Sequence, residues 1–139
     1  MSDKSNAAVE GGCLCGAVRY RASGPFHDRT ICHCETCRRA SGAPLVAWFS
    51  VPTGRFRWLG GTARSYQSSQ RATRTFCPDC GTALTYQRVD RPEEIDVTIA
   101  SLDQPATCLP EDHVWTARQL PWIKLDDGLP VYPQDRNDS

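Results

Sequence analysis

The sequence predicts an all-β domain, and three observations lead to that fold class. Clusters of Gly, Pro, Ser and Asp recur about every ten residues and mark turns. The segments between them are short and rich in β-branched or aromatic side chains. Only residues 34–41, CETCRRAS, have a pattern typical of a helical turn. Short extended segments between frequent turns are typical of an all-β domain with irregular loops.

The first expected strand covers residues 13–20, CLCGAVRY, in which apolar and other side chains alternate. Because side chains of a strand alternate between its faces, we expect Leu14, Val18 and Tyr20 to share one side. The mostly apolar run LVAWFSV at 45–51 follows the helical turn and predicts a second strand.

A Gly-Gly pair at 60–61 separates two further expected strands, RFRWL at 55–59 and ARSYQ at 63–67. Two extended segments around a tight glycine turn predict a β-hairpin. The pattern resumes after the CPDCG sequence and predicts two more strands. These remaining strands are ALTYQR at 83–88 and EIDVTIAS at 94–101.

At 139 residues the chain predicts one domain, which we place at 10–133 between short polar tails at 1–9 and 134–139. Its 16 basic and 16 acidic residues cancel, so there is no electrostatic reason to expect nucleic acid as a partner. No apolar run approaches the roughly 20 residues of a membrane span, and the first residues lack the apolar core of a signal peptide. We therefore expect a cytoplasmic protein without a membrane partner.

Eight cysteines are the most informative residues of the chain. Cytoplasmic thiols are normally kept reduced, and all but one of these cysteines fall into three tight clusters. Clustering lets several thiolates converge on one metal ion, whereas it does not help disulfide geometry. We therefore expect zinc, with disulfides or unrelated buried thiols as the alternatives. The cysteines are Cys13, Cys15, Cys32, Cys34, Cys37, Cys77, Cys80 and Cys108.

Two of the clusters are expected to combine into one closed site, called the four-cysteine set below. Cys13 and Cys15 are two residues apart on the expected strand, so both sulfurs should emerge on the same face. Cys77 and Cys80 belong to CPDCG, a tight knuckle in which Gly81 tolerates a positive φ and the turn directs both sulfurs to one point. Four thiolates complete a tetrahedral shell, which is a common ligand set of structural zinc.

The remaining cluster, the three-cysteine set, is one ligand short. Cys32, Cys34 and Cys37 are close enough in sequence to reach one ion. Three protein ligands and one exchangeable position are typical of a catalytic zinc, so we expect these cysteines to form the catalytic centre. The alternative is that Cys108 or a histidine completes the shell and makes the site structural. Three ligands bind more weakly than four and exposed thiolates oxidise, so we expect incomplete occupancy at this second zinc site.

Histidines and arginines near the clusters are candidates for supporting roles. On an extended backbone the His33 ring points away from the neighbouring cysteines, so we expect it behind the ligands or at the surface. His113, in EDHVW, is a candidate for substrate binding, with simple packing beside Trp115 as the alternative. Arg38 and Arg74 flank the clusters, where a guanidinium can offset thiolate charge or bind an anionic substrate; ion pairing in solvent is an equally good explanation.

Five stretches of the chain together resemble the glutathione-dependent formaldehyde-activating enzyme family, which is also described as a family of carbon–sulfur lyases. The resemblance extends from about Glu10 to Pro133, and the combination of cysteine motifs is highly specific. Centromere protein V is a relative by the same cysteine pattern. The stretches are GGCLCGAVRY at 11–20, CHCETCRRASGAP at 32–44, RTFCPDCGTAL at 74–84, IDVTIASLDQP at 95–105 and HVWTARQLPWIKLDDGLPVY at 113–132.

The resemblance implies a fold, cofactors and an activity. It implies the Mss4-like, or β-tent, fold, with several sheets arranged around zinc sites. It implies a structural zinc at the four-cysteine set and a second zinc, where chemistry occurs, at the three-cysteine set. The implied activity is the condensation of glutathione with formaldehyde to S-hydroxymethylglutathione, so the implied partner is a small thiol such as glutathione. Separately from what the resemblance implies, we hypothesise that Arg38, Arg39 or Arg74 receives the glutathione carboxylates.

Two hypotheses about function stay open, because fold alone does not fix function. The first is a zinc-dependent carbon–sulfur lyase that acts on a thiol adduct, and the second is a zinc-scaffolded binding module without catalysis. An exchangeable position at the second metal favours the enzyme, whereas a fourth protein ligand favours the module. A nucleic-acid-binding zinc protein is a weaker third hypothesis. The chain also has no long insertion from which we would expect a dedicated glutathione cleft.

Overall fold

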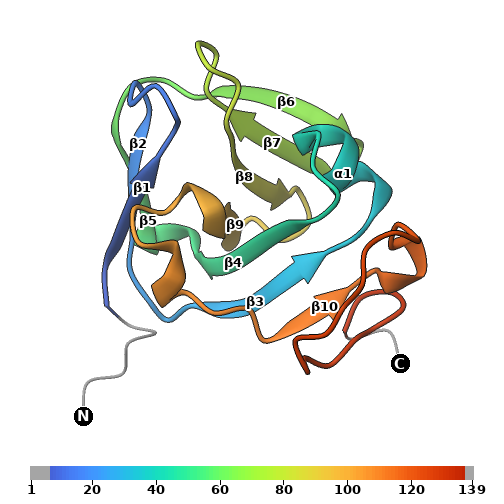
Figure 1. Cartoon of the computed structure of the whole chain (residues 1–139). Coiled ribbons are helices and arrows are strands. Elements are labelled where there is room, and N and C mark those ends of the chain that lie inside the picture. Colours follow the sequence, from blue (N-terminus) through green and yellow to red (C-terminus); the bar gives the residue numbers. More distant parts are fainter. Residues whose placement is uncertain (1–6, 137–139) are drawn as a thin grey trace.

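The computed structural model describes residues 7–136, and the expected tail residues 1–6 and 137–139 lie outside this range. The described chain folds into two β-sheets and one short α-helix, so the all-β prediction is confirmed (Figure 1). The strands are β1 (Val9–Gly12), β2 (Arg19–Ala22), β3 (His27–Cys32), β4 (Val46–Pro52), β5 (Phe56–Gly60), β6 (Arg64–Ser69), β7 (Ala72–Phe76), β8 (Ala83–Arg88), β9 (Glu94–Thr98) and β10 (Asp112–Val114). The helix is α1 (Glu35–Ser41), and short 3-10 turns cover Thr53–Arg55, Ile99–Ser101, Pro105–Thr107 and Thr116–Arg118.

The larger sheet has the strand order β10-β3-β4-β9-β8-β7-β6, and the smaller sheet has the order β1-β2-β5. All neighbouring strands are antiparallel except β10, which runs parallel to β3. The core contains side chains from both sheets, including the fully buried Tyr20 of β2, Phe49 of β4 and Leu84 of β8. Burial of this apolar surface holds the two sheets together.

Strand β4 serves both the core and the functional site. Consecutive side chains of a strand point to opposite faces of its sheet. Phe49 and Val51 belong to the core between the sheets, whereas Trp48 and Ser50 line a cleft on the other face. All four side chains are buried, which explains the nearly continuous apolar run LVAWFSV.

The segment 13–20 is not the continuous strand that its alternation predicts. Residues 13–18 form the turn between β1 and β2, and only its last residues belong to a strand. Leu14 is 89% exposed, whereas Val18 and Tyr20 are buried, so these three side chains do not share one side. A backbone hydrogen bond of 3.1 Å from Cys13 N to Val18 O closes the turn. The prediction failed because metal-ligand spacing and strand alternation give the same two-residue period at the two cysteines.

The predicted hairpin around 60–61 is also wrong, although both of its strands form. Strand β5 pairs with β2 in the smaller sheet, and β6 pairs with β7 in the larger sheet. Gly61 has φ +74° and packs so closely against the first cysteine turn that an added Cβ would lie 2.0 Å from Ala17 O. The glycine pair therefore lets the chain cross from one sheet to the other instead of folding back on itself.

Helix α1 forms where the sequence predicts a helical turn. Cys34 is its N-cap, and Cys34 Sγ accepts a hydrogen bond from Cys37 N at 3.3 Å. Gly42 ends the helix in the left-handed conformation, and its N–H donates to Arg38 O. A helix of seven residues is marginal by itself, so tertiary contacts must stabilise it.

The C-terminal part of the described chain packs against β10. His113 N donates to Pro130 O, and Tyr132 N donates to His113 O, both at 2.9 Å. The Arg136 guanidinium forms two hydrogen bonds of 2.9 Å with the Asp112 carboxylate. This segment closes one side of the cleft, while the domain boundaries at 10 and 133 stay a prediction.

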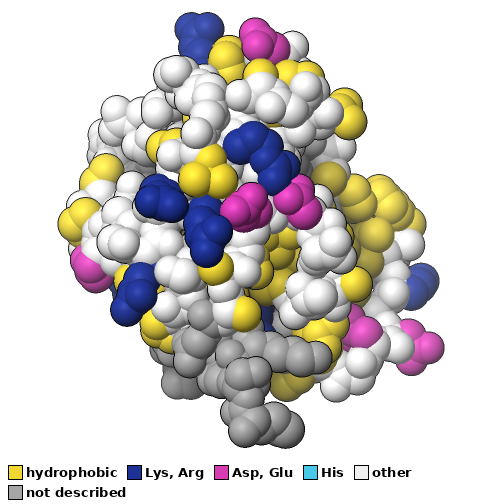
Figure 2. Space-filling view, turned by 90° about the vertical axis from the view of Figure 1, so that its left-hand side faces the viewer, with side chains coloured by type: hydrophobic (Ala, Val, Ile, Leu, Met, Phe, Trp, Pro, Cys, Tyr) yellow, Lys and Arg dark blue, Asp and Glu magenta, His cyan; other side chains and the backbone are white. Residues whose placement is uncertain are grey.

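The face that carries the smaller sheet has mixed charge (Figure 2). Arg19 forms an ion pair with Asp103, and Arg21 forms one with Glu10. Figure 2 shows basic, acidic and apolar side chains close together on this face. In the part of the chain from 7 to 136, no helix combines the length and the apolar character that a bilayer span requires.

Candidate metal centres and active-site cleft

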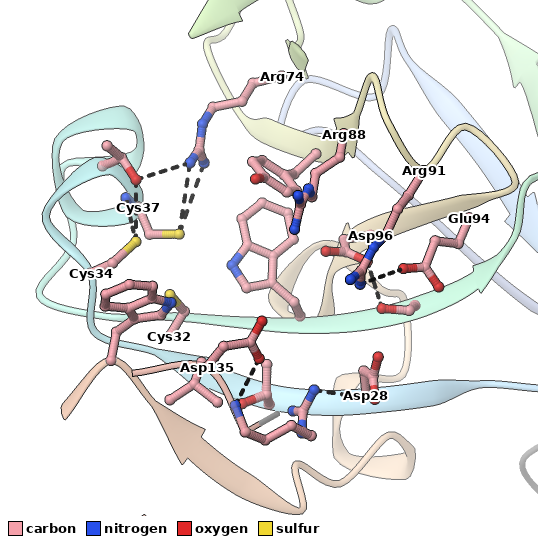
Figure 3. A pocket seen from close by; sticks show the side chains of 18 of the residues that line it. Asp28, Cys32, Cys34, Cys37, Arg74, Arg88, Arg91, Glu94, Asp96 and Asp135 are labelled. Atoms are coloured by element: carbon pink, nitrogen blue, oxygen red, sulfur yellow. Dashed lines mark hydrogen bonds and ion pairs between the residues drawn. The ribbon is translucent and has the colours of Figure 1, made fainter. Parts of the chain in front are cut away.

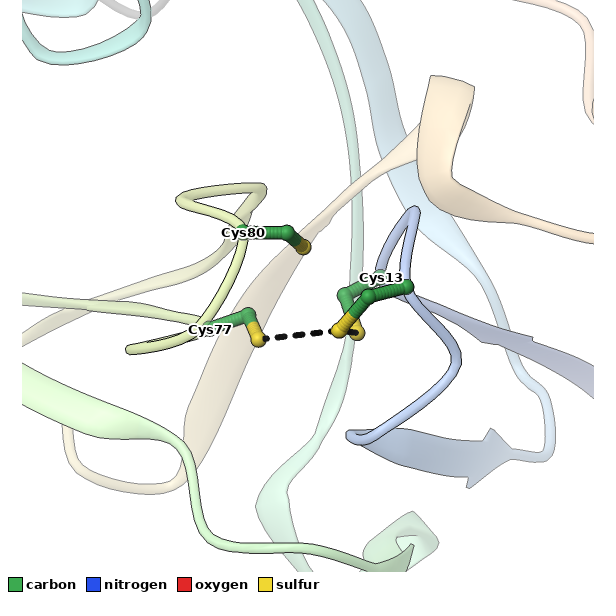
Figure 4. Close-up of side chains that lie close together, drawn as sticks. Cys13, Cys77 and Cys80 are labelled. Atoms are coloured by element: carbon green, nitrogen blue, oxygen red, sulfur yellow. Dashed lines mark hydrogen bonds between the residues drawn. The ribbon is translucent and has the colours of Figure 1, made fainter.

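Two turns from different sheets bring four sulfurs together (Figure 4). One turn follows β1 and the other follows β7. In each turn a glycine with positive φ follows the second cysteine, and its N–H donates to the carbonyl of the first cysteine; these glycines are Gly16 and Gly81. The chain therefore uses two similar knuckles, where the sequence predicted one knuckle and one strand. The sulfurs belong to Cys13, Cys15, Cys77 and Cys80.

The spacing of these sulfurs fits a tetrahedral metal ion. Cys15 Sγ lies 3.6 Å from Cys13 Sγ and 3.8 Å from Cys77 Sγ. Sulfurs bound tetrahedrally at the usual Zn–S distance lie about 3.8 Å apart. A disulfide needs about 2.05 Å between sulfurs, and all eight cysteines are free. The four-cysteine set can therefore hold a metal ion, and zinc fits it.

Strand β3 and helix α1 build the three-cysteine set. Cys32 is the last residue of β3, Cys34 caps α1, and Cys37 lies in the helix. Their sulfurs lie within 4.8 Å of one another. The capping hydrogen bond fixes the direction of the Cys34 thiol, and the first turn of the helix places Cys37 beside it.

The three-cysteine set gains no further protein ligand from residues 7–136. No His, Asp, Glu or other Cys of this range places a ligand atom within 4.8 Å of all three sulfurs. Cys108, the expected alternative ligand, is buried in the core between the sheets and borders a different cavity. Seven sulfurs are therefore divided four and three, and the second set offers three possible ligands.

Crowding makes three free thiolates unfavourable at this set. Hydrogen bonds from Cys32 and Cys37 lower the pKa of Cys34 to about 2, whereas its contacts with Cys34 and Cys37 raise the pKa of Cys32. Thiolates so close together repel, so one ionises at the expense of its neighbours. A cation bound between them would stabilise all three charges, which is the expected behaviour of a thiolate metal site.

Arg74 of β7 lies against the three-cysteine set. Its guanidinium nitrogens are 3.8 and 4.0 Å from Cys37 Sγ, and one of them is 3.5 Å from Thr36 Oγ1. The guanidinium also lies over the Tyr86 ring, 4.8 Å from its centroid, and the residue is only 9% exposed. Arg74 is thus placed to offset thiolate charge, one of the two roles that the sequence suggested.

A cleft of about 460 Å³ opens from the three-cysteine set (Figure 3). Its floor includes a row of side chains that lie directly opposite one another on four neighbouring strands of the larger sheet. This row is Ser50, Asp96, Tyr86 and Arg74. Helix α1 and the segment after β10 supply further lining residues. The cleft forms without a long insertion, because the sheet and the C-terminal segment supply its walls.

Charged side chains gather at the end of the cleft away from the sulfurs (Figure 3). Arg91 and Glu94 form an ion pair of 4.0 Å there. Burial raises the pKa of Asp96 to about 6; the Ser50 hydroxyl, which donates to Asp96, opposes this shift, while Glu94 and Asp28 add to it. The cleft thus combines thiols and aromatic rings at one end with both signs of charge at the other.

His33 and His113 lie behind the cysteines and do not line the cleft. They are 0% and 1% exposed, and His33 Nε2 lies 2.9 Å from His113 Nδ1. His113 Nε2 in turn lies 2.7 Å from Asp127 Oδ2. Burial and the nearby His113 lower the pKa of His33, so its ring stays neutral. The structure therefore does not bring His113 to the place where we expected it to bind substrate.

The chain matches one known protein family over most of its length. Residues 8–118 match the family model described as glutathione-dependent formaldehyde-activating enzyme. The chain belongs to this family. Membership confirms the resemblance seen in the sequence.

Individual relatives share between 25% and 38% sequence identity with this family member. It is 38% identical over 77 residues to an uncharacterized lyase of Schizosaccharomyces pombe, a match that covers 55% of this chain and 56% of the lyase. The match thus spans little more than half the length of that relative. The chain is also 25% identical over 127 residues to a protein of Halomonas elongata named "Putative glutathione-dependent formaldehyde-activating enzyme". This match covers 85% of the chain and 81% of the Halomonas protein. A crystal structure of a Rhodobacter sphaeroides protein is similar, with a TM-score of 0.56, 27% identity, and coverage of 88% of this chain and 98% of that one.

Among the arginines expected to bind substrate in this family member, the structure brings only Arg74 to the cleft. Arg38 lies on α1 outside the cleft lining, and its Nε is buried without a hydrogen-bond partner among the described residues. Trp48, Tyr86 and Asp96 also line the cleft, although no motif of the sequence indicated them. Trp48 and Asp96 alternate with core residues along their strands, so the period of two could have assigned them to the face opposite the core. Tyr86 lies two residues from the core residue Leu84, so the same period would have placed it on the core face.

Proposed function

We propose that this family member is a zinc-dependent carbon–sulfur lyase that makes or breaks thiol adducts, with glutathione and formaldehyde as its substrates. One observation carries the proposal: the three-cysteine set has three protein ligands within residues 7–136 and borders the cleft. A closed structural zinc site has four protein ligands, whereas a catalytic one keeps a position for substrate. The printed names of the family and of the Halomonas relative support the choice of substrates.

The proposed division of labour follows from the position of each side chain. Cys32, Cys34 and Cys37 would hold the zinc, which supplies a positive charge that lowers the pKa of an incoming thiol. Arg74 adds a second positive charge beside Cys37. Tyr86 keeps that guanidinium in place by stacking, and its ring forms an apolar wall of the cleft.

The proposed chemistry is an addition to an aldehyde. The thiolate sulfur attacks the carbonyl carbon and forms the C–S bond, while the carbonyl oxygen takes up a proton and becomes the hydroxyl of the adduct. The reverse reaction breaks the C–S bond and returns aldehyde and thiol. No oxidant or reductant is needed in either direction, which is consistent with a site that combines thiols, arginine and aromatic rings.

The far end of the cleft suits the charged ends of glutathione. Glutathione carries a carboxylate at each end and an ammonium group beside one of them. Arg88 and Arg91 line this end and are paired with Asp90 and Glu94, and each guanidinium has further N–H donors that would bind a substrate carboxylate. Asp96 and Glu94 lie in the same region and would accept hydrogen bonds from the ammonium group.

Sulfur coordination of the bound zinc tests this proposal directly. Seven cysteines on two zinc ions give an average of about 3.5 sulfurs per zinc, and one added thiolate raises it to about 4. We expect X-ray absorption to show this increase when glutathione is added to the two-zinc protein. S-methylglutathione is the matched control, because it has the same charged ends and no thiol, and it should leave the average unchanged.

The same samples separate the proposal from its alternative. A constant sulfur number with glutathione would contradict the lyase and favour a zinc-scaffolded binding module. Catalysis is then measured by the rate of exchange between formaldehyde and its glutathione adduct, with the Cys34→Ser variant as the reference for the uncatalysed reaction. Equal rates for the two proteins would also exclude the lyase.

A further inference from the structure

His33 lies between two cysteines of the three-cysteine set, and a single polar contact holds its ring. The ring is completely buried, and Nε2 lies 2.9 Å from His113 Nδ1. Nδ1 is also buried and has no hydrogen-bond partner among residues 7–136. The orientation of the His33 ring therefore depends on His113.

Asp127 in turn fixes the His113 ring. His113 Nε2 lies 2.7 Å from Asp127 Oδ2, and Asp127 Oδ1 accepts a hydrogen bond from Leu129 N at 3.1 Å. Because an ionised carboxylate only accepts hydrogen bonds, His113 Nε2 carries the hydrogen of this contact. His113 Nδ1 and His33 Nε2 form the next hydrogen bond of the series. The three side chains form one chain of hydrogen bonds that ends on a fixed negative charge.

The backbone connects the same two segments. Strand β10 pairs with β3, so that His113 lies opposite Ile31. His33 N donates to Val114 O at 3.1 Å. The peptide unit between Cys32 and His33 is therefore held by a main-chain contact, and the ring restrains the unit between His33 and Cys34 through the Cα atom that they share. Those peptide units set the directions in which the side chains of Cys32 and Cys34 leave the chain.

We propose that Asp127, acting through His113 and His33, is a positioning residue for the second metal centre. Partners of this kind behind metal ligands are known to matter, since their loss typically weakens metal binding about 10–100-fold. Here the partner acts on the residue between two ligands, and it links the loop after β10 to the three-cysteine set. The inference rests on the proposed metal at that set and does not depend on the lyase reaction.

The test compares zinc affinity at the two centres in Asp127→Ala. Competition with a chelator should show the second zinc bound about 10–100-fold more weakly, while the zinc of the four-cysteine set keeps its affinity. Cys34→Ser identifies which phase of the titration belongs to the second centre. Asp126→Ala is the matched control, because this neighbouring exposed carboxylate lies outside the hydrogen-bond chain. Asp127→Glu, which restores a carboxylate, should recover much of the affinity.

A spectroscopic measurement distinguishes positioning from general loss of structure. With cobalt(II) at the second centre, the visible absorption bands should change shape in Asp127→Ala and stay unchanged in Asp126→Ala. If Asp127→Ala loses its circular dichroism spectrum, Asp127→Asn gives the same comparison and keeps an acceptor for Leu129 N.

Three outcomes would overturn the inference. Unchanged affinity and spectrum in Asp127→Ala would show that the contact has no effect on the metal. An equal loss at both centres would show a structural role only. A wild-type protein that binds a single zinc would contradict the proposed function as well, whereas two bound zinc ions with an unaffected variant would overturn this inference alone.

Discussion

Arg74 and Asp96 show how single charged residues are placed along the cleft. They lie in the same cross-strand row, on either side of Tyr86. The cation is beside the sulfurs, where thiolate charge stabilises it, whereas the carboxyl is buried beside Ser50 and near other carboxylates. One row of side chains thus carries a cation beside the sulfurs and a buried carboxyl on the other side of Tyr86.

Asp96 gives a residue-scale prediction about pH and stability. Its pKa is raised to about 6 in the folded chain, from 3.8 for an unperturbed carboxyl. Between these values the folded state binds more protons than the unfolded state, so this residue lowers stability as pH rises, with the full loss above about pH 6. We expect Asp96→Asn to be more stable than wild type by on the order of 2 kcal/mol at pH 7.5, with a gain that shrinks towards pH 4. Urea unfolding at several pH values measures it.

Asp90 supplies a control of opposite sign for that experiment. Its contact with Arg88 lowers its pKa, so its contribution to stability is present at neutral pH and is lost as the pH falls. Asp90→Asn should therefore lose stability at neutral pH relative to wild type. A gain for Asp96→Asn that does not vary with pH would contradict the charge argument and indicate a packing effect.

At the scale of secondary-structure elements, Gly61 decides where the chain goes after β5. The positive φ of this residue and its contact with the first cysteine turn direct the chain from the smaller sheet to β6 of the larger one. The neighbouring Gly60 has neither property, since an added Cβ would meet no atom within 4 Å. The two glycines look alike in sequence and differ completely in their surroundings.

We expect Gly61→Ala to destabilise the protein by about 2 kcal/mol or more, because a Cβ there clashes with Ala17 O and the backbone is left-handed. Gly60→Ala, the adjacent control, should change stability by less than about 1 kcal/mol. Chemical unfolding of both variants with zinc bound gives the comparison. Equal effects would show that the close approach at Gly61 does not determine the path of the chain.

At the scale of the whole molecule, the four-cysteine set joins the two sheets. One knuckle connects β1 and β2 of the smaller sheet, and the other connects β7 and β8 of the larger sheet. Structural zinc contributes about 10–16 kcal/mol of apparent binding free energy, whereas a whole domain is stable by only about 5–15 kcal/mol. A metal held at this junction is therefore comparable in free energy to the entire fold.

The two cysteine sets should respond differently to the same substitution. We expect Cys77→Ser to give insoluble or unfolded protein, because it opens the junction between the sheets. Cys34→Ser should stay folded with one metal ion, since Ser is itself a favoured N-cap and preserves the start of α1. Circular dichroism and metal analysis of both variants measure this. Equal loss of structure in the two variants would refute the division into a structural and a catalytic centre.

Local patterns in the sequence predicted many elements correctly. The expected strand 83–88 is β8, the run 45–51 corresponds to β4, and the helical turn at 34–41 contains α1. The failures at 13–20 and around 60–61 occurred where glycines with positive φ serve long-range contacts. Turn chemistry shows that the chain bends at such a position, but which segment it meets depends on distant packing.

The sequence by itself determined the fold class, the family and the grouping of seven sulfurs, because ligand spacing and hydrophobic period are local properties of the chain. Only the tertiary structure decided that Cys108 stays apart and that the cleft lies on the sheet face opposite the core. It also decided that Asp127 reaches His33 through His113. Such contacts depend on strand register and on packing between residues far apart in sequence, which no local pattern specifies.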